Sequence, residues 1–223
     1  MNYQIIIPAR GGSKRFPGKN IALLDNKPLI QHTIEYALIN GYQNQIWVNT
    51  DDNLIADISK KEGVYITIRP DELGGDFVPT IDVLKHQLAF FRENNIPCDA
   101  IILLQATNPL RPINLLKEAV LIYESCSRES LGTFSKLNKK FGAIKDGLFI
   151  PENYIPGQRS QDLEKLFFEN GLLYITSANS ILKGNIITDD VYPMVIDDFE
   201  TNIDIDEPSD MILAEFIINK NGK

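Results

Sequence analysis

The chain has 223 residues, and its 22 Lys and Arg against 30 Asp and Glu give a formal net charge of -8. A hydrophobic fraction of 43% and a charged fraction of 23% are typical of a globular protein, and they exclude disorder, collagen and coiled coil. The acidic balance argues against a nucleic-acid-binding surface, because the average field repels phosphates.

The charge is divided unevenly along the chain. Residues 1–24 contain Arg10, Lys14, Arg15 and Lys19 and no acid, whereas residues 189–210 contain nine acids and no base. A basic loop near one end and an acidic strip near the other therefore account for most of the charge pattern.

No secreted or membrane class fits the sequence. Cys98 and Cys126 stand outside any CxxC spacing, so neither a disulfide framework nor a zinc site is predicted. The chain begins with a short apolar run that lacks a basic leader, and no stretch approaches the roughly 20 apolar residues of a membrane helix. We expect a cytoplasmic protein without a membrane partner.

Short apolar runs alternate with helical periodicity through the first half of the chain. This pattern predicts strands at 4–8, 45–50, 64–68 and 100–104, and helices at 28–40, 53–61, 79–94 and 114–125. Such repetition is typical of an α/β fold with a doubly wound, mostly parallel sheet between two helical layers. Ligands of these sheets bind beyond the carboxyl ends of the strands, which singles out the loops 9–20, 70–79 and 105–111.

The second half of the chain is less regular. We expect strands at 131–136, 148–150 and 171–176, and a closing helix at 207–219 that Pro208 begins. Residues 137–169 mix Lys, Gly, Pro and Gln without periodicity, and they are predicted to form an insertion that contacts a second subunit. The whole chain, 1–223, is expected to be one domain.

The loop after the first predicted strand reads ARGGSKRFPGKN over residues 9–20. Its glycines allow a ligand to approach the backbone, successive N–H groups can form an anion nest, and four cations can neutralise phosphate oxygens. Five residues, not four, separate Gly12 from Gly18, and Asn20 replaces the Ser or Thr of a Walker A loop. The alternative, a solvated basic loop, is disfavoured by the position directly after a buried strand.

Asp204 and Asp206 are separated by one residue in a segment that is interpreted as a strand. Residues i and i+2 of a strand point to the same face, so the two carboxylates are expected to project together. Paired carboxylates repel each other unless a cation lies between them, and hard oxygen ligands beside phosphate favour Mg²⁺.

Five segments, in this order, resemble the acylneuraminate cytidylyltransferases, also called CMP-sialic acid synthetases. They are IPARGGSKRFPGKN, Arg69–Leu73 (RPDEL) with Asp76, Leu104–Arg111 (LQATNPLR), Asn170–Ile175 (NGLLYI) and Ile203–Asp206 (IDID). The resemblance as a whole extends from residue 5 to about residue 215, so it covers nearly the whole chain. It implies a nucleotide-diphospho-sugar transferase-like fold and a homodimer with shared sites.

The resemblance also implies roles for individual residues. The residues implied to bind the CTP phosphates are Arg10, Gly11, Gly12, Ser13, Lys14, Lys19 and Asn20, although Asn20 could reach the ribose instead, and those implied to bind cytosine and ribose are Arg69, Val78 and Thr80. The residues implied to bind the sugar are Gln105, Thr107, Arg159, Asn170 and Tyr174, with Arg159 on the sugar carboxylate. Asp204 and Asp206 are implied to bind Mg²⁺. Arg10, Lys19 and Asp206 are the expected catalytic residues.

The resulting hypothesis is transfer of CMP from CTP to the anomeric hydroxyl of a sialic acid-type nine-carbon 2-keto sugar acid, with release of pyrophosphate. The base is either Asp206 or a metal-bound hydroxide. The alternatives are a 3-deoxy-manno-octulosonate cytidylyltransferase, another sugar nucleotidyltransferase, and a non-catalytic nucleotide-binding subunit. Residues 185–188 read NIIT where some members are aromatic, so N-acetylneuraminic, deaminated, legionaminic and pseudaminic acids all stay open.

Overall fold

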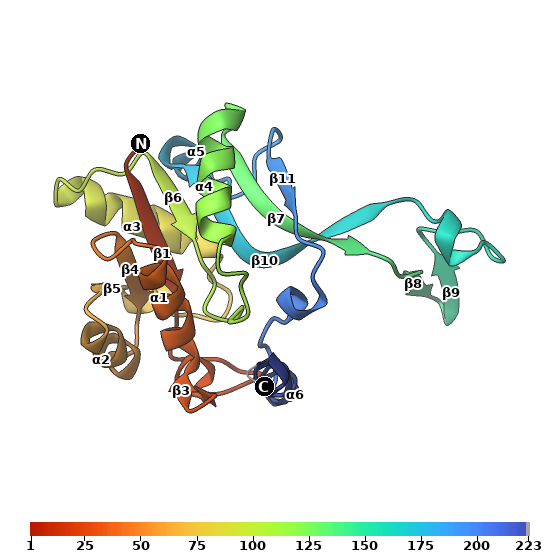
Figure 1. Ribbon diagram of the computed structural model, residues 1–223, viewed down its shortest axis with the longest axis horizontal. Coiled ribbons are helices and arrows are strands. Elements are labelled where there is room, and N and C mark those ends of the chain that lie inside the picture. Colours follow the sequence, from red (N-terminus) through yellow and green to blue (C-terminus); the bar gives the residue numbers. More distant parts are fainter. Residues whose placement is uncertain (222–223) are drawn as a thin grey trace.

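The computed structural model describes residues 1–221, so residues 222–223 of the expected domain lie outside the described residues. A seven-stranded sheet with the order β11-β7-β10-β6-β1-β4-β5 forms its centre (Figure 1). Its strands are β1 (Tyr3–Pro8), β4 (Ile46–Thr50), β5 (Tyr65–Ile68), β6 (Ala100–Leu103), β7 (Ser130–Leu137), β10 (Leu166–Ser177) and β11 (Tyr192–Val195). Strand β10 is antiparallel to both neighbours, and every other adjacent pair in this sheet is parallel. The expected mostly parallel sheet is confirmed.

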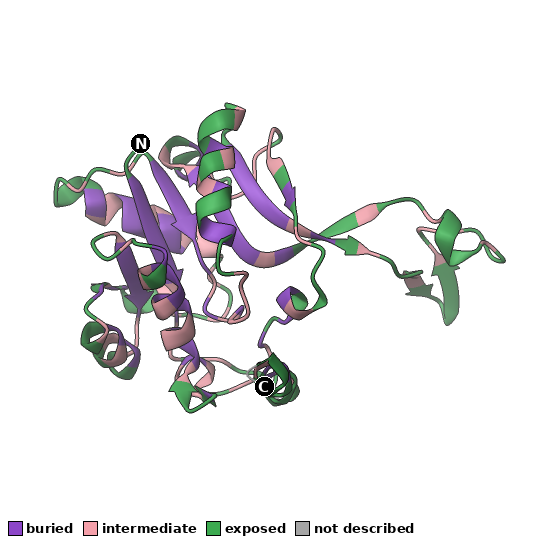
Figure 2. Ribbon diagram, in the orientation of Figure 1, coloured by how far each residue is buried: buried purple, intermediate pink, exposed green. Residues whose placement is uncertain are grey.

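Helices cover both faces of the sheet because each central strand is apolar on both sides. In β1, Ile5 and Ile7 belong to one core cluster and Ile6 belongs to the other, as period-2 alternation requires. Helices α1 (Leu29–Ile39), α2 (Asn53–Lys61) and α4 (Leu115–Cys126) pack on the first face, and α3 (Thr80–Glu93) and α5 (Ala178–Lys183) pack on the second. Figure 2 shows the buried strands between these layers. The three-layer, doubly wound architecture is thereby confirmed.

A third, smaller core joins the two ends of the chain. Helix α6 (Pro208–Asn221) packs against the short hairpin of β2 (Leu23–Leu24) and β3 (Lys27–Pro28), with Ile203 and Ile205 between them. The basic loop precedes β2 and the acidic segment precedes α6, so this core brings segments nearly 190 residues apart side by side. No helix within residues 1–221 is long and apolar enough to cross a membrane.

An arm extends from the body of the molecule (Figure 1). Strands β7 and β10 continue pairing beyond the sheet, and a separate hairpin of β8 (Gly142–Lys145) and β9 (Leu148–Pro151) forms the tip. The expected irregular insertion is therefore partly ordered, and β10 begins at Leu166 instead of residue 171. Several apolar side chains of the arm are exposed, namely Ile144, Leu148, Phe149, Ile150 and Ile155.

The elements that the sequence did not predict are short. Strand β11 has four residues and α5 has six, too few for either period to emerge above the neighbouring composition. A local signal for α5 does exist, because the Ser177 side chain accepts a hydrogen bond from the Ser180 N–H at its N-terminus.

Arg111, the last residue of the LQATNPLR segment, connects three parts of the fold. Its guanidinium donates to the carbonyl oxygens of Leu172 and Gln105 and to the Thr33 hydroxyl, and lies 5.6 Å from the centre of the Tyr36 ring. Burial of the guanidinium lowers the pKa of Arg111 to about 10, although the residue as a whole is only partly buried. This arginine serves the scaffold.

Replacing Arg111 by Leu is expected to lower the free energy of unfolding by about 3 kcal/mol, because three acceptors lose their donor in the interior. Urea denaturation followed by circular dichroism measures the change. The control, Arg92→Leu on the exposed side of α3, should change stability by less than about 0.5 kcal/mol. Equal stability of the two variants would contradict this role of Arg111.

Candidate functional site

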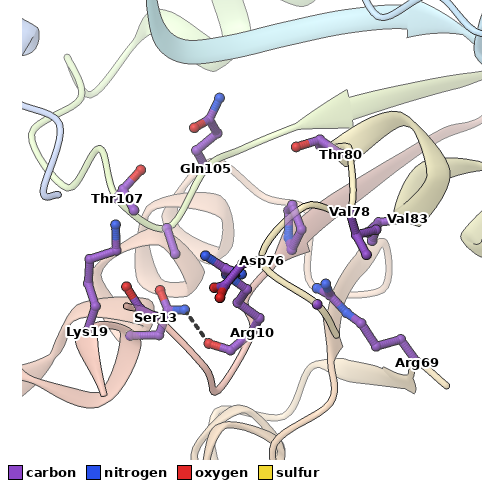
Figure 3. Close-up of a pocket in the computed structure, with 14 residues that line it drawn as sticks. Arg10, Ser13, Lys19, Arg69, Asp76, Val78, Thr80, Val83, Gln105 and Thr107 are labelled. Atoms are coloured by element: carbon purple, nitrogen blue, oxygen red, sulfur yellow. Dashed lines mark hydrogen bonds and ion pairs between the residues drawn. The ribbon is translucent and has the colours of Figure 1, made fainter. Parts of the chain in front are cut away.

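A cavity of about 270 Å³ lies beyond the carboxyl ends of β1 and β6 (Figure 3). The three loops singled out from the sequence all contribute to it. Its lining consists of Pro8, Arg10, Ser13, Lys19, Asn20, Arg69, Gly75, Asp76, Val78, Thr80, Val83, Gln105, Ala106 and Thr107. The fold thus brings together nine of the residues expected to bind a nucleotide or sugar.

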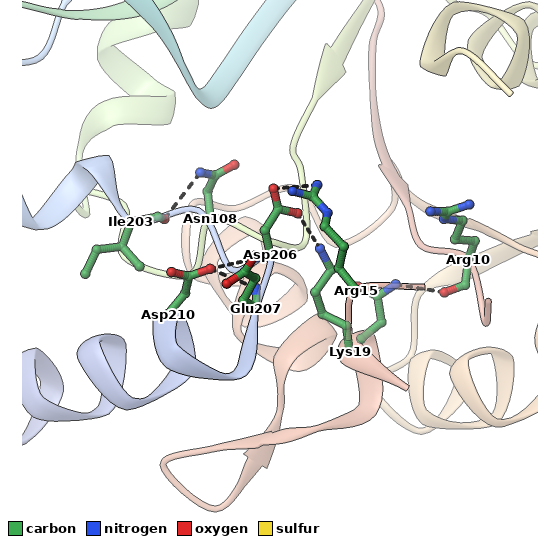
Figure 4. Close-up of polar contacts among 9 residues, drawn as sticks. Arg10, Arg15, Lys19, Asn108, Ile203, Asp206, Glu207 and Asp210 are labelled. Carbon is green, nitrogen blue, oxygen red and sulfur yellow. Dashed lines mark hydrogen bonds and ion pairs between the residues drawn. The ribbon is translucent and has the colours of Figure 1, made fainter. Parts of the chain in front are cut away.

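Two carboxylates pair with the four cations of the 9–20 loop. Asp76 contacts Arg10 Nη1 at 2.6 Å and Lys14 Nζ at 2.9 Å. Asp206 contacts Arg15 Nη2 at 2.8 Å and Lys19 Nζ at 2.9 Å (Figure 4). A smaller cavity of about 230 Å³ lies between the two clusters and is lined by all four cations and both carboxylates. The four cations can therefore bind the oxygens of a polyanion in place of the carboxylates of Asp76 and Asp206.

Both carboxylates are held in their ionised form. The hydrogen bond from Lys14, and the charges of Lys14 and Arg10, lower the pKa of Asp76 below its ordinary value. Partial burial tends to raise the pKa of Asp206, but Lys19 and Arg15 outweigh burial and lower it. At neutral pH the two carboxylates therefore compensate two of the four positive charges, and the loop keeps an excess of positive charge.

The backbone of the basic loop is supported by the short segment between β4 and α2. The Gly11 N–H donates to Asp51 Oδ1 at 3.0 Å, and a Cβ on Gly11 would lie only 2.4 Å from Asp52 Oδ2. Asp52 caps α2, while the buried Asn20 amide donates to the Arg10 carbonyl oxygen at 2.9 Å. Gly11 is thus required for close approach of two chain segments, and its N–H, expected to contribute to an anion nest, is engaged by Asp51.

Arg69 is a buried cation on the opposite wall of the cavity. It is 5% exposed, and it donates to the carbonyl oxygens of Asn49 at 2.6 Å and Leu73 at 3.2 Å. Its Nε–H has no hydrogen-bond partner in the part of the chain that the structure describes. Val78 and Thr80 line the cavity beside it. The wall therefore offers a fixed donor next to an apolar side chain and a hydroxyl.

The segment of Asp204 and Asp206 is extended but has no strand partner within residues 1–221, which corrects the expected strand. Ile203 and Ile205 are buried and the aspartates face outward, so the period-2 argument still holds. The Ile205 N–H donates to the Thr107 carbonyl oxygen at 2.8 Å, which fixes the segment against the cavity wall.

Asp204 and Asp206 differ in their surroundings. Although Asp204 as a whole residue is exposed, partial loss of water around its carboxyl raises its pKa, and the charge of Asp206 adds to this, whereas the Thr107 hydroxyl opposes it. Among residues 1–221 no three His, Cys, Asp or Glu side chains converge as a metal site, so the chain offers carboxylates in a pair. Mg²⁺ commonly takes one or two protein carboxylates together with water and substrate phosphates, and the pair fits that donor set.

The expected sugar-binding residues are only partly assembled. Gln105 and Thr107 line the main cavity, and Tyr174 lines an adjoining one. Asn170 is buried and acts in the scaffold: its Nδ2 donates to Ser135 Oγ, and its backbone carbonyl accepts from Asn108. Arg159 is exposed in the arm, pairs with Asp162, and is not among the residues that line the cavities described above.

Sequence reasoning missed the structural roles of Asp76, Asp51 and Asn108. Asp76 pairs with a residue 66 positions away, and no local spacing indicates such a contact. Asn108 is fully buried and donates to the carbonyl oxygens of Asn170 and Ile203, which ties the 105–111 loop to β10 and to the aspartate segment. Because Asn108 belongs to the LQATNPLR segment, the sequence predicts that it lies in a loop at the site. The sequence does not predict that Asn108 connects this loop to two distant segments.

Comparisons with known proteins agree with this geometry. The family described as "Cytidylyltransferase" matches residues 4–218. A CMP-N,N′-diacetyllegionaminic acid synthase of Legionella pneumophila is 31% identical, over 99% of this chain and 98% of its own length. A pseudaminic acid cytidylyltransferase of Campylobacter jejuni is 30% identical over 97% of this chain and 96% of its own length. An N-acylneuraminate cytidylyltransferase of Streptococcus agalactiae is 34% identical over an aligned region that covers 80% of this chain and 44% of that protein.

Solved structures support the fold. A CMP:2-keto-3-deoxy-manno-octonic acid synthetase complexed with CTP superimposes with a TM-score of 0.72, 17% identity and coverage of 99% of this chain and 100% of that chain. A 4-diphosphocytidyl-2C-methyl-D-erythritol synthase gives a TM-score of 0.67 at 12% identity, with coverage of 97% and 98%. At these identities the likeness concerns architecture alone.

The family match over residues 4–218 and the curated relatives confirm the resemblance that was inferred from the five sequence segments.

Acid titration of Asp76 is expected to weaken the fold. Because the folded-state pKa is lowered, the ion pairs stabilise the protein above the ordinary pKa of an aspartate, and this stability is lost as pH falls below about 4. In Asp76→Asn that part of the pH dependence should be absent, as measured by urea unfolding from about pH 3 to 7. Asp57→Asn, on the exposed side of α2, should keep the wild-type pH dependence. An unchanged acid slope in Asp76→Asn would refute the assignment.

Proposed function

Because this chain belongs to the cytidylyltransferase family, we propose that it transfers CMP from CTP to the anomeric hydroxyl of a nine-carbon 2-keto sugar acid of the sialic acid type. One observation carries the proposal: the four cations of the 9–20 loop line one cavity, and two of them, Arg10 and Lys19, also line a second cavity together with the buried Arg69. The Nε–H of Arg69 has no hydrogen-bond partner among residues 1–221. The names of the relatives supply the sugar class.

The triphosphate is proposed to enter the smaller cavity between Asp76 and Asp206. Its oxygens would take Arg10, Lys14 and Lys19 from the two carboxylates, a direct exchange of one charge-assisted partner for another. The backbone of the loop is already held by Asp51 and Asn20, so the cations can change partners while the loop stays in place. Binding therefore involves side-chain movement on a fixed backbone.

The cytosine and ribose are proposed to lie against Arg69, Val78 and Thr80. Arg69 is held by two backbone carbonyls, so its position is set before the base arrives. A buried unpartnered donor carries a desolvation cost that a base carbonyl can relieve. Recognition by such a donor requires an acceptor on the base, which cytosine supplies through its ring carbonyl.

The chemistry is an in-line displacement at the α-phosphorus. The anomeric oxygen forms a bond to the α-phosphorus, the bond from this phosphorus to the bridging oxygen of the β-phosphate breaks, and pyrophosphate leaves with that electron pair. Positioning and charge neutralisation supply most of the rate in such transfers, and Arg10 and Lys19, which line the cavity, would stabilise the leaving group. If Asp206 accepts the hydroxyl proton, Lys19 and Arg15 must release it first, because both of its oxygens are ion-paired.

Asp204 and Asp206 are proposed to hold Mg²⁺, which when bound would neutralise phosphate charge. The support is the chemistry of the donor set, two hard carboxylates on one side of an extended segment beside the phosphate-binding loop. The cytoplasmic location expected from the sequence belongs to the same proposal.

A screen of pyrophosphate release tests the activity. CTP should be used in preference to ATP, GTP and UTP, with one of N-acetylneuraminic, N,N′-diacetyllegionaminic or pseudaminic acid as acceptor. Arg10→Ala should weaken CTP binding about tenfold or more in calorimetry, because a charge-assisted contact to phosphate is lost. Arg92→Ala is the matched surface control. Selective use of 3-deoxy-manno-octulosonate would contradict the nine-carbon sugar and support the alternative sugar class.

Replacing Asp206 by Asn removes the charge while keeping the shape of the side chain. CTP-dependent binding of Mn²⁺, followed by electron paramagnetic resonance, should be lost, and turnover should fall about a hundredfold or more. Asp189→Asn, an exposed residue of the same acidic strip, should retain both properties. Undiminished Mn²⁺ binding by Asp206→Asn would remove this residue from the metal site.

We further propose a homodimer in which the arm of each chain reaches the partner's site. The support is that the arm exposes apolar side chains, and that Arg159 lies in this arm and lines none of the site's cavities in its own chain. An arm of this composition is stabilised when a second surface removes its apolar groups from water. Arg159 would then be available for the sugar carboxylate of the neighbouring site.

Complementation between inactive variants tests this arrangement. Arg159→Ala and Asp206→Asn should each lose activity, and their co-refolded mixture should recover about a quarter of wild-type activity. The reason is that about half of the dimers contain one chain of each variant, and one of the two sites in such a dimer combines an intact body with an intact arm. Two copies of Arg159→Ala alone serve as the control. A monomer in light scattering, or no recovery on mixing, would contradict the shared site.

A further inference from the structure

A side cavity of about 250 Å³ opens from the main one and has a different chemical character. Thr80 and Gln105 line both cavities, so the two adjoin each other. Beyond them the side cavity is lined by Leu103, Glu169, Tyr174, Ile186 and Ile187. The main cavity contains three cations, whereas the only charged residue lining the side cavity is Glu169.

Glu169 is placed there by an irregularity in β10. Residues 169 and 174 are five positions apart and would point to opposite faces of a regular strand. Their partners on β7, Phe134 and Gly132, are only two positions apart, and Gly171 between them has a positive φ of 75°. The bulge turns Glu169 toward the same side as Tyr174, and the Tyr174 hydroxyl donates to Glu169 Oε2 at 3.1 Å.

The pair is set up to accept a hydrogen bond. Burial, together with the Glu169 charge, raises the pKa of Tyr174, so the phenol stays protonated and continues to donate to the carboxylate. The Tyr174 bond engages Oε2, which leaves Oε1 without a hydrogen bond from the described residues. Ile186 and Ile187 form the apolar wall and supply no positive charge. A negatively charged group of a ligand would therefore be repelled here, whereas an N–H or O–H group would be attracted.

We propose that Glu169 is a specificity-determining residue for the sugar. It accepts a hydrogen bond from an amide N–H or hydroxyl on the end of the sugar remote from the reacting carbon, and it rejects sugars that carry a second negative charge at that end. The inference rests on the proposed function, since it assigns the side cavity to the same acceptor. It defines the substrate class as sugars whose single anionic group is the carboxylate next to the anomeric carbon.

Glu169→Gln separates this role from a structural one. With the sugar that the wild-type enzyme uses in the screen, the variant should raise the KM for the sugar roughly tenfold or more while the KM for CTP stays unchanged. An analogue of that sugar with its remote terminal carbon oxidised to a carboxylate should be a poor substrate of the wild type. Glu169→Gln should improve the relative kcat/KM for this analogue about tenfold or more.

Two further variants complete the design. Glu169→Asp keeps the charge, so it should continue to reject the oxidised analogue even if its KM for the normal sugar rises. Glu93→Gln, an exposed residue at the end of α3, is the matched control and should behave as wild type. An active wild type with unchanged selectivity in Glu169→Gln overturns this inference alone, whereas a wild type inactive with every sugar acid overturns the proposed function as well.

Discussion

Ion pairing between the basic loop and two distant carboxylates is the constraint on which the site depends. Four cations within ten residues of chain would repel one another, and Asp76 and Asp206 each hold two of them and compensate one positive charge of each pair. The pairs are only partly buried, so each is a modest contributor to stability and can be exchanged for a ligand. A polyphosphate that offers more oxygens than the two carboxylates is the natural competitor.

The scaffold places those carboxylates where the loop needs them. The small core of α6, the β2–β3 hairpin and Ile205 carries Asp206 to the loop, and Asp210 accepts the N–H groups of Asp206 and Glu207 at the start of α6 (Figure 4). Asn108 ties the aspartate segment to the carboxyl end of β6. These contacts connect the charge balance of the loop to the packing of the chain's two ends.

Polarity changes in one direction across the combined cavity. It is cationic at the loop, neutral around Gln105 and Thr80, and anionic at Glu169. A substrate pair with a triphosphate at one end and an uncharged sugar terminus at the other matches this gradient. The arm with Arg159 lies outside it, and in the proposed homodimer the arm of the second chain would bring a further cation to the sugar carboxylate.

Much of the fold followed from sequence alone, because buried parallel strands such as β1 and β6 are continuous apolar runs, and because helices such as α3 have a clear period and a proline at the start. The basic loop and the aspartate pair were also recognisable, since their chemistry is encoded in adjacent residues. Tertiary structure alone decided that Asp76 pairs with Arg10 and that Asn170 supports the scaffold. It also decided that a bulge in β10 directs the Glu169 side chain toward the side cavity. Those outcomes depend on contacts across tens to hundreds of residues and on strand register, and local spacing carries no information about either.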